Sequence, residues 1–245
     1  MTAPTGDQSG GPARRDRWAH RRGEPRVFAL FLSIYLLLAA LTTVLATPAL
    51  GSPSEATLRR GAGMLLLIVS SAVAVVWPMI RLSQSSPEKP ASAALADWVV
   101  VALLAQAVIW PMTLLPGGAL IRPIPWPGLW SWGVSAGIGV ALASWGLLIG
   151  SLVALGTAGR SAGARTLWMA GIVLLISASP IAGWVTAGAS PAGGAWELMS
   201  PITALSAVVR ARSGLLPRVD GVEWAASLAP ALVSLPLWLM ARRRS

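Results

Sequence analysis

The sequence predicts an all-α integral membrane protein: a bundle of about six transmembrane helices with a short interfacial or re-entrant helix before the last span. The first observation is composition, since 55% of the 245 residues are hydrophobic and only 11% are charged, whereas soluble domains carry about 25% charged residues. The second is pattern. The apolar residues form long continuous runs, as in membrane helices, and do not alternate as in the strands of a barrel.

Six apolar runs are long enough to cross the hydrocarbon core of a bilayer, which takes about 20 helical residues. They cover residues 27–47, 61–80, 95–115, 129–155, 167–187 and 222–240. The chain therefore divides into a basic tail rich in Gly, Pro and Arg (residues 1–26), which we expect to be disordered, a membrane domain (residues 27–241) and a second basic tail (residues 242–245).

The distribution of basic residues orients the spans. With six spans, thirteen of the nineteen Lys and Arg residues lie in the two tails and in the second and fourth loops, and six lie on the other side. The positive-inside rule then predicts that both termini are cytoplasmic, in a multi-pass protein of the cell membrane. The net charge of +10 follows from this topology, so we expect no nucleic-acid partner.

Several kinds of chemistry lack the residues that would carry them. The chain has no cysteine, and its only histidine, His20, lies in the first tail, which excludes thiolate sites, paired-histidine zinc sites and a histidine-dependent protease. It contains no G-x-x-x-x-G-K-[ST] motif, so it cannot hold ATP in a P-loop. We expect no enzyme activity, no cofactor and no metal.

Polar residues inside the spans are few. Asp97 and Glu223 lie at the predicted starts of the third and sixth spans, where the helix dipole favours a negative charge. An ion-coupled transporter usually carries an ionisable residue deep inside a span, so ion coupling is disfavoured. Gln106 is the most polar side chain deep in a span, and we expect it to form a helix–helix hydrogen bond, with a substrate contact as the alternative.

A stripe of small residues runs along one face of the fourth span, at positions i, i+4, i+7 and i+11. Such stripes let helix backbones approach closely. We interpret the stripe as packing inside one bundle, although a contact with a second subunit would use the same device. Its residues are Gly139, Ala143, Gly146 and Gly150.

Prolines interrupt the last two spans, Pro180 in the fifth and Pro230 and Pro236 in the sixth. Each proline leaves the carbonyl four residues earlier without its helical donor. Nearby serines, among them Ser177 and Ser234, could bond these free carbonyls. Tryptophans lie near several span ends, including Trp77, Trp98 and Trp110, where we expect them to anchor the chain at the membrane interface.

The segment SPITALSAVVRARSGLLP (residues 200–217) precedes the last span. Ser200 suits an N-cap and Pro201 the first helical position, and the pattern predicts a short helix over about residues 200–212. Two arginines make it too charged to cross the bilayer, so we expect it to dip into or lie on the outer face. Its apolar face carries Ile202, Leu205 and Val209.

This segment resembles the region between the fifth and sixth spans in permease subunits of ABC transporters of the ABC-2 exporter class. In that family a Ser/Asn-Pro and a short aliphatic helix return partway into the outer leaflet. The matching residues here are 200–205. The wider layout of six spans with cytoplasmic basic tails is similar as well.

The resemblance implies a separate ATPase subunit and a homo- or hetero-dimer with another permease. The family commonly carries an acidic-basic stretch such as E-R-E after the second span, where the permease meets its ATPase. Here that loop reads RLSQSSPEKPASAALADW, with Glu88–Lys89 as its charge pair. By this resemblance Arg81, Glu88 and Lys89 would face the ATPase, a helix over residues 91–97 would dock a partner, and the helix from Ser200 to Val209 would gate the outer side.

Two other classes remain open beside the permease subunit. One is a non-transporting membrane scaffold or assembly partner, and the other is a self-sufficient facilitator. No charged or aromatic pocket converges within the predicted spans, so the sequence favours a lipid or other hydrophobic cargo over ions. Membrane lipid is the one partner common to all three classes.

Overall fold

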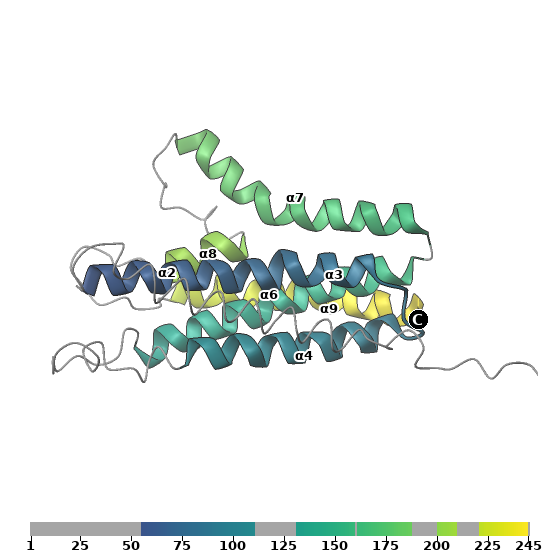
Figure 1. Cartoon of the computed structure of the whole chain (residues 1–245), viewed down its shortest axis with the longest axis horizontal. Coiled ribbons are helices and arrows are strands. Elements are labelled where there is room, and N and C mark those ends of the chain that lie inside the picture. Colours follow the sequence, from purple (N-terminus) through teal and green to yellow (C-terminus); the bar gives the residue numbers. More distant parts are fainter. Residues whose placement is uncertain (1–54, 111–130, 160, 188–199, 210–220, 245) are drawn as a thin grey trace, which may run out of the picture.

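The structure, a computed structural model, describes residues 55–110, 131–159, 161–187, 200–209 and 221–244. These residues form helices with short connections and contain no strand. Five of the helices are long and apolar enough to cross a membrane, and they lie side by side in a bundle (Figure 1). The protein is therefore an all-α, multi-pass membrane protein. The predicted first span, residues 27–47, lies outside the described residues.

The second predicted span is one continuous helical rod with an irregular centre. It comprises α2 (Glu55–Ser71), a π-helical turn η2 (Ala72–Val76) and α3 (Trp77–Ser83). The wide π turn lies immediately before Pro78, whose ring would clash with the carbonyl of Ala74 in a regular helix. The rod therefore continues through the proline and runs beyond the predicted end at residue 80.

The third span begins earlier than predicted. Helix α4 (Pro90–Ile109) starts at a proline, which fits the first helical position because its missing N–H has no partner there. The helix predicted over residues 91–97 is continuous with the third span, since these residues form the first turns of α4, and its docking role stays a prediction. Ala91, Ala93 and Ala94 are buried there against the bundle.

The later helices follow the predicted pattern. They are α6 (Trp132–Ala158), α7 (Ala162–Ala187), α8 (Pro201–Val209) and α9 (Gly221–Arg244). Ser131 caps α6, its side-chain oxygen accepting from the Val134 N–H at 3.4 Å. Glu223 lies in the first turn of α9, as the dipole argument predicts.

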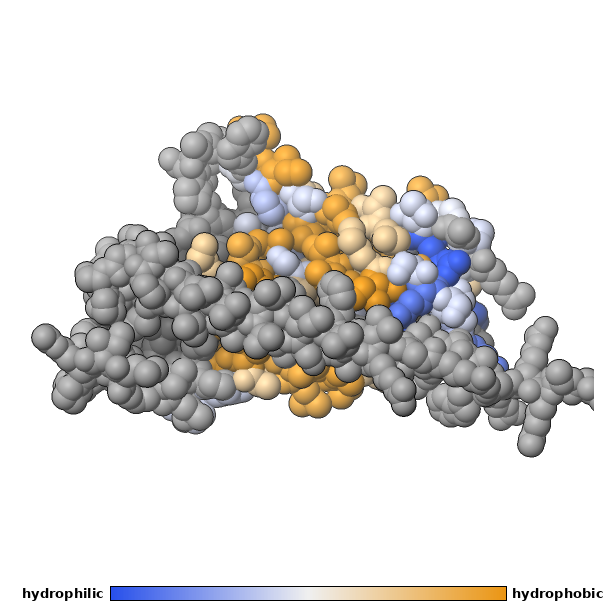
Figure 2. Space-filling view, in the orientation of Figure 1, coloured by the Kyte–Doolittle hydropathy of each residue, from blue (hydrophilic) through white to orange (hydrophobic). Residues whose placement is uncertain are grey.

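Helix α6 is the centre of the bundle. It contains no charged residue and packs most extensively against α9 and α4, with further contacts to η2, α3, α7 and α8. Most of its side chains are buried, whereas α7 and α9 expose large apolar residues such as Leu174 and Leu232. Apolar surface of this kind suits contact with lipid, and orange, hydrophobic residues lie above and below the grey atoms on the face shown in Figure 2.

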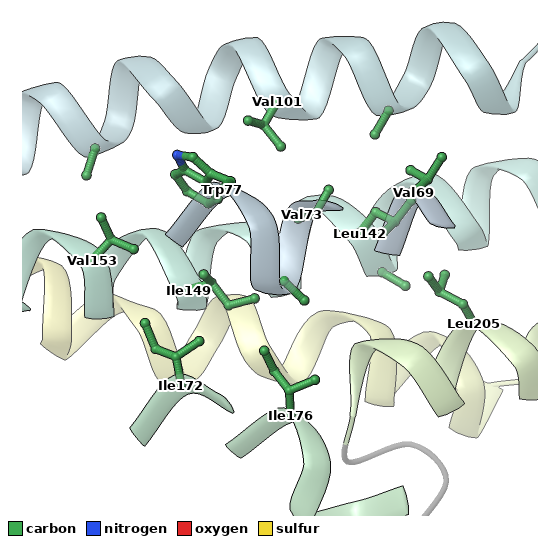
Figure 3. Packing of buried hydrophobic residues seen from close by; sticks show 14 of the residues in the cluster. Val69, Val73, Trp77, Val101, Leu142, Ile149, Val153, Ile172, Ile176 and Leu205 are labelled. Carbon is green, nitrogen blue, oxygen red and sulfur yellow. The ribbon is translucent and has the colours of Figure 1, made fainter. Parts of the chain in front are cut away.

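The core lies between the rod of α2, η2 and α3, helix α6 and helix α7. Figure 3 shows Trp77 and Val73 of the rod beside Ile149 and Val153 of α6. Trp77 is only 2% exposed, so its predicted role as an interface anchor is wrong. Because the rod runs on to Ser83, Trp77 lies inside the bundle.

Successive long helices run in opposite directions, which gathers the connection 84–89, the start of α7 and the end of α9 at one end of the bundle (Figure 1). Hydrophilic side chains collect there, as the blue region of Figure 2 shows, and six of the residues at this end are basic. We call this the basic end. Its residues are Arg81, Lys89, Arg165, Arg242, Arg243 and Arg244.

Candidate functional site

The first candidate is α8, the short helix of the SPITAL segment, which lies away from the basic end (Figure 1). Ser200 stands at its N-cap and is fully buried. The Ser200 hydroxyl oxygen accepts from the Ile202 N–H at 3.4 Å, and Pro201 occupies the first helical position. The local chemistry of the segment thus starts a helix where the sequence predicts one.

The Ser200 hydroxyl also reaches another helix. It donates to the backbone carbonyl of Ile176 in α7 at 2.8 Å. That carbonyl lies four residues before Pro180, which has no N–H to offer it. Helix α7 is bent in Figure 1, as a proline inside a helix predicts. The N-cap of α8 therefore supplies the hydrogen bond that Pro180 removes from α7.

Two of the serines predicted to fill this role bond elsewhere. Ser177 Oγ donates to the Val173 carbonyl, and Ser234 Oγ donates to the Ala231 carbonyl at 2.7 Å. Neither of these acceptors lies four residues before a proline. The interpretation of Ser177 and Ser234 as partners of freed carbonyls is therefore wrong.

The apolar face of α8 is turned into the bundle. Leu205 is 2% exposed and belongs to the core cluster, Ala204 is buried, and Ile202 packs against the same cluster. The helix contacts α2, α6 and α7, and Figure 3 shows Leu205 near Val69 and Leu142. Four predicted gate residues, Ser200, Pro201, Ile202 and Leu205, thus lie between helices; the Val209 side chain lies outside the described residues.

The second candidate is the small-residue stripe of α6. An added Cβ at Gly139 would stand 2.5 Å from Gln106 Oε1, and one at Gly146 would stand 3.1 Å from Trp98. At Gly150 it would meet Trp77 and Trp238, each at 3.2 Å. These positions therefore face other helices of the same chain at close range.

The close approach lets three polar side chains reach backbone carbonyls of α6. The acceptors are spaced four residues apart and so form a line along the helix. Because Gln106 is one of the donors, its predicted helix–helix hydrogen bond is confirmed. The bonds are Gln106 Nε2 to Gly139 O at 3.2 Å, Trp98 Nε1 to Ala143 O at 3.0 Å, and Trp238 Nε1 to Leu147 O at 3.2 Å.

The third candidate is the ion pair between α3 and α4. Arg81 Nε lies 2.9 Å from Asp97 Oδ2, and Arg81 Nη1 donates to Gln84 Oε1 at 3.2 Å. The Arg81 side chain is only 8% exposed. The interpretation of Asp97 as a helix-start residue is wrong, because α4 begins seven residues earlier. This pair was not predicted from the sequence, where its signal is two opposite charges flanking a short connection between antiparallel helices.

The connection 84–89 joins α3 to α4 at the basic end. Arg165 of α7 donates from Nη1 to the Gln84 carbonyl. This hydrogen bond attaches the connection to α7, in addition to α3 and α4, which it joins. Glu88 and Lys89 are exposed, whereas Arg81 is buried. Of the three residues predicted to face an ATPase, Glu88 and Lys89 are therefore available at the surface.

The described residues offer no group of three or more His, Asp or Glu side chains that could hold a metal ion. Comparison of the whole chain with protein-family models, curated proteins and solved structures finds no match.

Proposed function

We propose that this chain is the membrane-embedded permease subunit of an ABC-type exporter, energised by a separate ATPase chain. The observation that carries the proposal is α8, a short apolar helix that folds back between the spans and caps the proline bend of α7 through Ser200. The absence of a P-loop from the sequence is consistent with an energy source on another chain.

The bond between Ser200 and Ile176 gives α8 a mechanical link to a spanning helix. A proline bend is a natural hinge, because the helix lacks one hydrogen bond there. A rotation of α7 about Pro180 would displace α8, with Leu205 moving against α2 and α6. The helix from Ser200 to Val209 would in this way open or close the outer side of the bundle.

The basic end supplies the other half of the proposal. If it faces the cytoplasm, as the positive-inside rule favours, both termini are cytoplasmic and the connection 84–89 is available to the ATPase. Glu88 and Lys89 would make the contact. Arg81, through Asp97, would pass the force on to α4, and Arg165 would pass it on to α7. The permease would work as a dimer with an identical or related chain.

Purification of the tagged chain in mild detergent tests the ATPase contact. We expect a stoichiometric ATPase subunit in the wild-type preparation and a several-fold weaker capture with Glu88→Ala plus Lys89→Ala, because both exposed contacts are lost. Arg243→Ala plus Arg244→Ala is the control, since it also removes charges at the basic end. A wild-type preparation without any ATPase would support the membrane scaffold in place of the permease.

A double-mutant cycle tests the link between α8 and the proline bend. Ser200→Ala should lower the free energy of unfolding, because it removes the donor to Ile176, a bond between membrane helices worth about 0.6 kcal/mol on average and at most about 1.7 kcal/mol, and it also removes the N-cap acceptor of α8. In a Pro180→Ala background the same change should cost less by about the value of this bond, because the backbone N–H that alanine brings to this position can donate to the Ile176 carbonyl, whereas the loss of the α8 N-cap is common to both backgrounds. Equal costs of Ser200→Ala in both backgrounds, measured by unfolding in mixed micelles, would contradict the link.

A further inference from the structure

A groove of about 630 Å³ lies at the basic end between the first turns of α4 and the last turns of α9. Leu95 of α4 and Leu235 and Leu239 of α9 form its walls, and Leu147 of α6 contributes to its floor. Lys89, immediately before α4, and Arg242, near the end of α9, complete the lining at the end where the helices meet the basic surface.

The groove exists because α4 and α9 each pack along α6 and make fewer contacts with each other. Small residues at the start of α4, Ala91 and Ser92, leave room beside α9. On the other side the Trp238 ring is fixed, since its Nε1 donates to the Leu147 carbonyl at 3.2 Å and its edge lies near Gly150. The wall of the groove on the side of α9 is therefore already in place without a ligand.

Charge and apolar surface are separated along this groove. The Lys89 and Arg242 side chains, which line the groove, are both exposed. Glu88, which precedes Lys89 in the sequence, is an exposed carboxylate, while Asp97 is paired with Arg81. Toward the middle of the bundle the lining is apolar, with Leu235 59% and Leu239 61% exposed. A ligand with an anionic head and a hydrocarbon tail matches both regions.

We propose that this groove binds an anionic phospholipid from the leaflet at the basic end. Lys89 attracts the headgroup phosphate as a point charge, and the Arg242 guanidinium adds a second positive charge at the same end of the groove. One acyl chain lies along Leu95, Leu235 and Leu239. Basic pockets between membrane helices select anionic headgroups in this way. The cationic group of a zwitterionic lipid is repelled by the same two side chains. This inference does not depend on the transport function.

The test reconstitutes the full chain in nanodiscs that contain phosphatidylglycerol and phosphatidylcholine, and then measures retained lipid by native mass spectrometry. We expect wild type to retain phosphatidylglycerol in preference. Lys89→Gln plus Arg242→Gln should weaken that retention by about thirty-fold, from two surface charges at the bilayer. Arg243→Gln plus Arg244→Gln also removes two positive charges, but these residues do not line the groove, so this control should change phosphatidylglycerol retention little. Arg242→Gln alone should cause part of the loss of phosphatidylglycerol retention. This single variant keeps Glu88 and Lys89, the proposed ATPase contacts, so it separates lipid binding from the ATPase contact.

Equal retention of the two lipids, or equal losses in the two double variants, would overturn the proposal. The predicted span over residues 27–47 is the competing occupant. Because the chain has no cysteine, Leu239→Cys can be paired with single cysteines along that span. Efficient disulfide formation at helical intervals would place the span in the groove and exclude the lipid. Absence of cross-linking together with selective phosphatidylglycerol retention supports the lipid.

Discussion

Asp97→Ala is expected to lower the free energy of unfolding by about 3 kcal/mol, because it leaves the Arg81 charge without its carboxylate. Removing one partner of a buried ion pair typically costs about 3–5 kcal/mol. The lower figure applies here, since the Asp97 side chain is 27% exposed and Gln84 still accepts from Arg81. Equilibrium unfolding of the purified chain in mixed micelles measures the loss.

Glu88→Ala is the matched control for this prediction. It also removes a carboxylate from the basic end, but Glu88 is exposed, so the change should stay within about 0.5 kcal/mol. Arg81→Met with Asp97→Leu replaces the pair by apolar side chains and should recover most of the stability. If Asp97→Ala were as stable as Glu88→Ala, the ion pair would not hold α3 to α4.

The spans could be predicted because lipid imposes a simple rule. A helix forms all of its backbone hydrogen bonds internally. With about 20 apolar residues it can therefore cross the membrane regardless of which helices pack beside it. Five of the six predicted runs correspond to helices of the structure. Their ends were harder to predict, since Pro90 starts a helix and Pro78 lies inside one. A proline is tolerated at the first position of a helix, as Pro90 is, or inside a helix next to a π turn, as Pro78 is. Sequence pattern alone does not distinguish these cases from a proline that ends a helix.

The contacts of the candidate sites could not be predicted in the same way. Pro180 indicates that the Ile176 carbonyl needs a donor, but the local pattern favours Ser177 over Ser200, which follows 24 residues after the acceptor. The pairing of Arg81 with Asp97 likewise depends on how the two helices align across the connection 84–89. Such contacts are properties of tertiary packing, which sequence periodicity does not encode.

Gly150→Leu is expected to lower the free energy of unfolding by about 3 kcal/mol. A single Cβ at this position already meets the Trp77 and Trp238 rings at 3.2 Å, and a leucine adds three further carbons in the same space. Overpacking of a core costs about 1–3 kcal/mol. The upper end applies because Trp77 is buried and Trp238 is held by its hydrogen bond to α6.

Gly171→Leu in α7 is the matched control, since an added Cβ there has no neighbour within 4 Å. It should change stability by no more than about 0.5 kcal/mol. The cost of Gly150→Leu should also be independent of protein concentration, because both rings belong to the same chain, whereas a stripe that joined two subunits would give a concentration-dependent loss. A concentration-dependent cost would therefore assign Gly150 to a dimer contact and contradict packing within one bundle.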